Sequence, residues 1–248
     1  MHVRDVSPRD WHSAYAATYL ERDVRQLLDV RDLSLFQKFL RACAARCGQL
    51  LNLSALGADL GLSHSTARQW LSVLEAGYVV QLLYPFHRNF GKRLVKAPKL
   101  YFADTGLAAW LLGIRTAAEL DVHPMRGALF ETWMVGELRK HLSNLGEAGH
   151  LWFWRDSAGH EIDLVVELGE KLIGIEAKSG QTLGSDAASG LTRWADMTGS
   201  RPARNAAADN DTAKNWLVFG GEGDYMRGAI RTVGWRQFPK AVQGALQL

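Results

Sequence analysis

The chain contains little cysteine. Among its 248 residues only two cysteines occur, Cys43 and Cys47. They stand four positions apart in a helical pattern, with no Cys or His partner at the spacing of metal ligands. We therefore expect two buried, reduced thiols and neither a disulfide framework nor a cysteine metal site.

Long hydrophobic runs are also missing. The longest candidate, residues 106–112, is far shorter than the roughly 20 apolar residues of a membrane-spanning helix. Near the N-terminus, Asp5 and Asp10 occupy positions where a signal peptide needs an apolar core. These absences predict a cytoplasmic protein with no membrane partner. Its 47% hydrophobic and 22% charged residues are typical of a globular protein of one large or two small domains.

A nucleotide-binding P-loop is absent as well. The pattern Gly-x-x-x-x-Gly-Lys-Ser/Thr occurs nowhere, and Gly91-Lys92-Arg93 lacks both the earlier glycine and the following hydroxyl. We expect no nucleotide cofactor and no ATPase activity from this chain.

Acidic residues are missing from one long segment. The net charge is only +3, but no Asp or Glu occurs between Glu75 and Asp104. That segment contains aromatic residues and a group of cations, Arg88, Lys92, Arg93, Lys96 and Lys99. Such clustering can neutralise several phosphates of DNA in a salt-dependent way.

The preceding residues have the pattern of a helix-turn-helix. An amphipathic helix is predicted over 35–46, a short helix over 54–61, and a third helix over 64–76 with Ser63 as its cap. Residues 79–84 and 99–102 are predicted wing strands with the basic segment between them. Arg68 is the one cation among the exposed residues of the third helix. Two interpretations stay open: DNA contact, supplied by the wing more than by the helix, or a protein-interaction or spacer module.

A β-hairpin farther along carries three charged residues of catalytic type. Residues 161–167 and 172–178 are predicted strands, and Gly169-Glu170 is predicted to be a two-residue turn with Gly169 at positive φ. This register places Asp163 opposite Glu176 and leaves Ile162 with Leu164 and the other apolar residues on the opposite face.

Directly opposed carboxylates repel each other, and a cation between them would remove the repulsion. Asp163, Glu176 and the backbone carbonyl of Ala177 offer the oxygen ligands that Mg²⁺ accepts, and Lys178 is placed to orient or activate a water. Glu131, near the start of a predicted helix, is a further candidate ligand. The alternative is a solvated strand face, because Asp followed at a distance by Glu-x-Lys is common by chance.

These residues resemble a known family. Glu131 on a helix, Asp163 on a strand and Glu176-Ala177-Lys178 on the next strand follow the order of the PD-(D/E)XK nuclease superfamily, with Ile162 in the place of proline. Four stretches resemble the C-terminal half, the DUF4143 domain, of AAA-type ATPases: residues 19–24, 98–107, 127–131 and 154–163. The resemblance covers nearly the whole chain from about residue 10, without the ATPase domain. It implies that Asp163 and Glu176 bind metal and that Lys178 assists the nucleophilic water.

The predicted organisation combines these elements in an α/β (α+β) protein. Residues 1–34 form a helical segment that resembles the tail of an ATPase lid. A winged helix spans 35–104, a helical connector spans 105–124, and a restriction-endonuclease-like mixed sheet flanked by helices spans 125–248. Strands are expected at 151–154, 216–219 and 230–233, with a helix at 187–197.

Two functions follow from this organisation. The first is a Mg²⁺- or Mn²⁺-dependent nuclease that hydrolyses DNA phosphodiester bonds, with a winged helix that binds DNA through Arg68, Arg88, Lys92, Arg93 and Lys96. The second is a non-catalytic DNA- or protein-binding accessory module of an AAA-type ATPase. A third possibility is that the chain acts with an ATPase supplied in trans, which would dock through residues 1–34.

The missing P-loop gives a direct prediction. The isolated chain should neither bind nor hydrolyse ATP, because it has no glycine-rich loop and lysine to hold the phosphates. Equilibrium titration with a fluorescent ATP analogue should show no saturable binding. Saturation at micromolar nucleotide would contradict the prediction.

Overall fold

The computed structural model describes residues 6–18, 32–87, 95–147, 149–169, 171–199 and 213–246, with Lys171 described by its backbone alone. The chain divides into two compact units, the first of Met1–Leu82 with Ala97–Thr132 and the second of Leu83–Lys96 with Trp133–Leu248. Within the described ranges, no helix has the length and apolar character that crossing a membrane requires.

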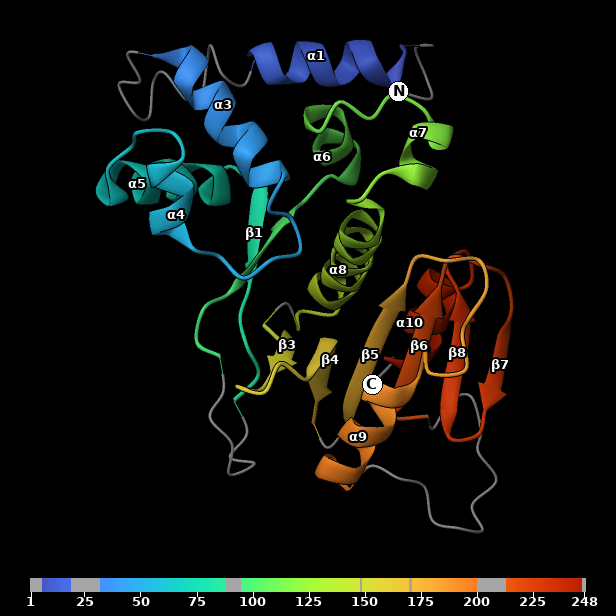
Figure 1. Cartoon of the computed structure of the whole chain (residues 1–248). Helices are drawn as coiled ribbons and strands as arrows, with labels where there is room; N and C mark the ends of the chain where they lie inside the picture. The colour runs from blue at the N-terminus through green and yellow to red at the C-terminus, as the bar shows by residue number, and fades with distance from the viewer. Residues whose placement is uncertain are drawn as a thin grey trace. The chain divides into compact units, whose positions relative to one another are not determined.

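The first unit is mainly helical (Figure 1). Its elements are α1 (Pro8–Thr18), α3 (Leu33–Ala44), α4 (Leu53–Ala58), α5 (His64–Ala76), the paired strands β1 (Val80–Leu83) and β2 (Lys99–Phe102), α6 (Thr105–Leu111) and α7 (Ala117–Val122). Side-chain caps fix the helix starts, since Asp32, Asn52 and Ser63 accept hydrogen bonds from the first turns of α3, α4 and α5. The predicted cap at Ser63 is confirmed.

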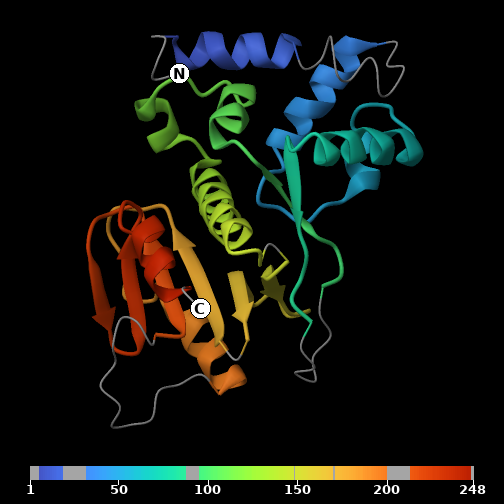
Figure 2. The same ribbon diagram turned by 180° about the vertical axis from the view of Figure 1, so that it is seen from behind.

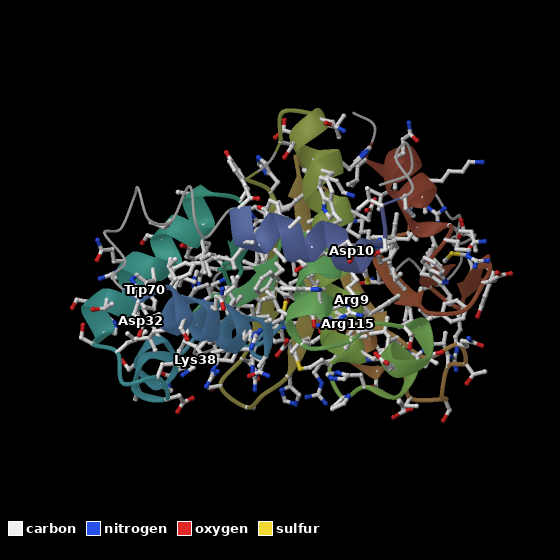
Figure 3. All side chains as sticks on the ribbon, turned by 90° about the horizontal axis from the view of Figure 1, so that it is seen from above. Arg9, Asp10, Asp32, Lys38, Trp70 and Arg115 are labelled. Atoms are coloured by element: carbon white, nitrogen blue, oxygen red, sulfur yellow. The ribbon has the colours of Figure 1, made fainter. Side chains whose placement is uncertain are left out.

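Aromatic residues hold α3 against α5. The ring of Trp70 packs edge-on against Phe36 and Phe39, with centroid distances of 5.1 and 5.4 Å. Figure 3 labels Trp70 and the cap residue Asp32, and both lie beside α3. Cys43 and Cys47 are free and buried as expected, and burial raises the pKa of the Cys43 thiol to about 12.

The second unit is built on a mixed six-stranded sheet. Its strands are β3 (Leu151–Arg155), β4 (Glu161–Leu168), β5 (Lys171–Lys178), β6 (Asn215–Phe219), β7 (Asp224–Arg227) and β8 (Ile230–Gly234). They lie in the order β3-β4-β5-β6-β8-β7. The β5–β6 and β6–β8 pairs are parallel and the others antiparallel. The predicted fold class, helices followed by a mixed sheet, is confirmed.

Helices cover both faces of this sheet. Helix α9 (Ser189–Thr198) lies on the face seen in Figure 1, and α10 (Phe238–Ala245) lies on the face seen from behind in Figure 2. On the α9 face, Trp194 packs against Trp154 with their rings 5.5 Å apart. On the other face, Phe238 packs against Trp216 and against Trp133 of α8 (Arg126–Asn144).

Part of the acid-free segment follows the edge of the sheet. The main-chain N–H of Phe86 donates a hydrogen bond to Phe153 O, and the N–H of Phe153 donates one to Tyr84 O. Farther along, Val95 N donates to Arg155 O at 3.3 Å. Both described ends of the basic segment are therefore attached to β3 in the second unit.

The packing of α9 gives a stability prediction. A Cβ added at Gly174 would lie 2.6 Å from Nε1 of the buried Trp194, so Gly174→Ala forces that ring to move. We expect a loss of about 1–3 kcal/mol in the free energy of unfolding, measured by urea denaturation. Gly244→Ala is the control, because its Cβ would meet nothing within 4 Å and alanine favours the helix. Equal stability of the two variants would contradict the packing.

Candidate functional site

The predicted hairpin is present with its predicted register. Strand β4 pairs with β5 through five facing pairs, from Leu164↔Ile175 to Leu168↔Lys171. Gly169 takes a φ of +56°, which the tight turn requires and which glycine adopts without strain. The register and the glycine's backbone conformation are therefore confirmed.

A bulge interrupts β4 where the acidic residues begin. Trp152 faces Val165, whereas Trp154 faces Ile162, so two steps along β3 correspond to three along β4. The extra residue reverses the alternation, and Ile162 packs in the α9-side core with Val165 and Leu172. The prediction that Ile162 shares a face with Leu164 is wrong, because the hairpin pattern holds no sign of how β3 pairs.

Asp163 lies in this bulge and reaches across to β5. Its Oδ2 accepts a 2.8 Å hydrogen bond from the backbone N–H of Ala177. The pair Asp163–Glu176 is not among the regular facing pairs, which end at Leu164. The two carboxylates nevertheless act on each other, because the charge of Asp163 raises the pKa of Glu176.

Glu176 is a buried carboxyl group in a crowded position. It is 7% exposed, and its Oε2 lies 3.1 Å from Nζ of Lys178. A Cβ added at Gly190 of α9 would lie 2.6 Å from Oε1, so the missing side chain of Gly190 leaves room for this carboxyl group. Burial first, and then the charge of Asp163, raise the pKa of Glu176 to about 7, although Lys178 opposes them.

Lys178 stays a cation in this setting. Burial alone would lower its pKa, but the charges of Glu176 and Asp163 outweigh burial and raise the pKa above its ordinary value. Its side chain is 43% exposed. The structure therefore brings Asp163, Glu176 and Lys178 together as predicted partners.

A polar cleft of about 600 Å³ opens beside Glu176 and Lys178. The remaining lining residues come from the segment after β5 and the start of α9: Ser179, Gly180, Thr182, Leu183, Gly184, Asp186, Ala187, Ser189 and Gly190. Asp186 also contributes to the raised pKa of Lys178. No motif in the sequence marks these residues, because only the fold of the loop brings them to the site.

Glu131 belongs to the first unit. Its Oε1 lies 2.8 Å from Nζ of Lys99, and the hydroxyl of Tyr101 donates a hydrogen bond to the same oxygen. Lys99 is almost fully buried, so this ion pair supplies a partner for a buried cation. The role of Glu131 as a metal ligand stays a prediction, as does that of the Ala177 carbonyl.

The predicted nucleic-acid contacts come from both units. Arg68 is exposed on α5 in the first unit, and Lys96 is exposed beside Val95 in the second. Arg88, Lys92 and Arg93 lie outside the described residues.

The raised pKa of Glu176 predicts a pH-dependent stability in the absence of metal. The folded state holds this proton up to about pH 7, whereas the ordinary pKa is 4.5, so the folded state binds more protons between these values. The contribution of Glu176 to the free energy of unfolding should therefore fall as the pH rises from 4.5 to 7. Urea denaturation in EDTA should show the wild type losing stability relative to Glu176→Gln across this range. A difference that does not change with pH would contradict the assignment.

Comparison with known proteins divides the chain into two parts. Residues 2–118 match the family described as "Domain of unknown function (DUF8612)", and residues 126–233 match "Domain of unknown function (DUF4143)". The sequence predicts a resemblance to DUF4143 along nearly the whole chain, but the match to that family covers residues 126–233 only. A second family covers the N-terminal part.

Curated relatives extend beyond this chain. "Uncharacterized protein Rv2008c" of Mycobacterium tuberculosis and "Uncharacterized protein Mb2031c" of Mycobacterium bovis are each 32% identical over 212 residues, which cover 86% of this chain and 44% of the relative. The chain spans less than half the length of these relatives. The family matches therefore place a DUF4143 domain at residues 126–233, which contains Asp163, Glu176 and Lys178, after a DUF8612 region at residues 2–118.

Proposed function

We propose that the second unit is a metal-dependent nuclease that hydrolyses phosphodiester bonds of DNA. The observation that carries this proposal is the convergence of Asp163, Glu176 and Lys178 at the end of one strand pair, beside a polar cleft. Their order along the chain is that of the PD-(D/E)XK superfamily. The mixed sheet with helices on both faces is compatible with a restriction-endonuclease-like core.

The donor set fits Mg²⁺ or Mn²⁺. Carboxylate oxygens are the ligands that these hard cations prefer, and Asp163 and Glu176 supply them. The raised pKa of Glu176, about 7, means that Lys178 alone does not offset burial and the charge of Asp163 in the metal-free protein. A divalent cation bound by both carboxylates would supply that compensation. It would also supply Lewis acidity and lower the pKa of a bound water.

The chain's own residues have distinct roles in this proposal. Asp163 is fixed by the Ala177 N–H, so its second oxygen has a defined orientation. Lys178 remains protonated, which suits it to hold a water and to stabilise negative charge that develops on the phosphate. A protonated lysine is a poor general base, so its part is orientation and charge stabilisation.

DNA contact is proposed for the exposed cations of both units. Lys96 and the basic segment next to it belong to the same unit as the carboxylates, because Tyr84, Phe86 and Val95 are attached to β3. Arg68 would contribute from the first unit. The alternative is a non-catalytic DNA- or protein-binding module of an ATPase, in which the acidic residues survive as a weak metal site.

A cleavage assay tests the proposed function. Labelled single- and double-stranded DNA and RNA should be incubated with the wild type and with Lys178→Ala in Mg²⁺ or Mn²⁺. We expect metal-dependent cleavage of DNA by the wild type and a loss of at least about 100-fold in Lys178→Ala, since removal of one charge-stabilising group costs this much in other enzymes. Cleavage that survives unchanged in Lys178→Ala would remove the site assignment, and no cleavage by the wild type would favour the accessory module.

Metal binding is tested separately by thermal unfolding. Mg²⁺ or Mn²⁺ should raise the Tm of the wild type by mass action. Asp163→Asn should abolish that increase, while its amide oxygen still accepts from Ala177 N–H and preserves the fold. Glu167→Gln is the matched control, because it removes a carboxylate from the same strand farther along β4. A metal response that persists in Asp163→Asn would exclude Asp163 as a ligand.

A further inference from the structure

A second polar cluster lies at the turn between β3 and β4. Asp156 is 3% exposed, and its Oδ1 accepts hydrogen bonds of 2.9 Å from the backbone N–H groups of Ala158 and His160. Its Oδ2 lies 2.9 Å from Nδ1 of His160. The turn thus holds a buried carboxylate that fixes the orientation of one imidazole ring.

Asp156 is ionised in this position. Burial alone would raise its pKa, but the hydrogen bonds and charge of His160 outweigh burial, so the pKa lies below its ordinary value. With Nδ1 held by Asp156, the other ring nitrogen, Nε2, faces α9. There it makes a hydrogen-bonding contact with Nη1 of Arg193.

This cluster lies next to the carboxylate site. Gly190 of α9 contacts Glu176, and a Cβ added there would also lie 3.6 Å from the backbone oxygen of Glu161, the residue that follows His160. Arg193 is three positions after Gly190, so both lie on the same face of α9. Gly190, which lies against Glu176, and Arg193, whose guanidinium lies beside His160, therefore project from the same face of α9.

The charges of the cluster suit an anion. Arg193 is exposed, and a guanidinium presents several N–H donors in the geometry that phosphate accepts. The nearby Arg155 differs, because Glu161 pairs with it at 3.1 Å. With the Nδ1–H of His160 donated to Asp156, Nε2 accepts from Nη1 of Arg193, so the imidazole orients the guanidinium.

We propose that Arg193 binds a backbone phosphate of the nucleic-acid strand whose neighbouring phosphodiester lies at Glu176 and Lys178, with His160 and Asp156 as the positioning residues that orient its guanidinium. The identity of the ligand rests on the proposed nuclease function. The competing explanation is a purely structural contact that joins α9 to the β3–β4 turn.

Binding without metal tests this subsite independently of cleavage. Fluorescence anisotropy with a fluorescein-labelled DNA single strand, and with its duplex, should be measured in EDTA over a series of salt concentrations. Arg193→Gln should bind several-fold more weakly, and the slope of log K against log salt should shrink by about 0.7 for the single strand, the value for one lost phosphate contact. Arg193→Lys should recover most of the slope, because it restores the charge. The same series with RNA, and competition by inorganic phosphate, shows whether the backbone phosphate alone is recognised.

Arg236→Gln is the matched control. Arg236 is an exposed arginine of the same unit that pairs with Glu222 at 2.9 Å, so its loss removes the same charge from another surface. We expect a smaller change in slope than for Arg193→Gln. If the two variants give the same affinity and slope, the proposed subsite is overturned.

The positioning role of Asp156 has its own readout. Asp156→Asn removes a negative charge, so general electrostatics would strengthen DNA binding. We expect the opposite, weaker binding, because an amide holds less firmly the imidazole that orients Arg193. Stronger binding by a folded Asp156→Asn protein would refute that role. If the wild type cleaves nothing but Arg193→Gln still loses the phosphate contact, the proposed function fails while the subsite stands.

Discussion

The hydrogen bond from the Ala177 N–H to Asp163 is the interaction on which the site depends. In a regular ladder that N–H would face a main-chain carbonyl, but the bulge in β4 brings a carboxylate to it instead. A negative charge is thereby held next to the buried Glu176, whose pKa rises. The bulge therefore brings two carboxyl groups together in a position where ionisation of Glu176 is unfavourable.

The sequence predicts the hairpin well because both strands carry their pattern locally. Alternating apolar residues and a turn glycine are enough to set the pairs from Leu164 to Leu168. The bulge has no such local signal, because it arises from the pairing of β4 with β3. Strand β7 and helix α10 were missed for related reasons: Asp224–Arg227 is largely exposed and short, and Phe238–Ala245 contains Pro239 and Gly244, which weaken a helical pattern.

The basic segment has a neighbour that its local pattern does not show. It stands between two strands that pair with each other, β1 and β2, and so the sequence describes it as a wing. Its described ends instead bond to β3, and residues 83–96 group with the sheet. Main-chain hydrogen bonds to a strand edge depend on no side-chain pattern, so composition cannot reveal them. The consequence for function is that positive charge and the carboxylates occur in the same unit.

Helix α9 connects the two polar clusters of that unit. Its buried face, with Leu191 and Trp194, fixes the helix on the sheet, and the absence of a side chain at Gly190 lets Glu176 lie against its first turn. Because the helix is rigid, the position of Arg193 relative to Glu176 is determined by that packing and not by a flexible loop. In the proposed function, Asp163 and Glu176 would repel a phosphodiester unless positive charge stood close by. Arg193, one helical turn away from Gly190, would supply that charge without pairing with either carboxylate.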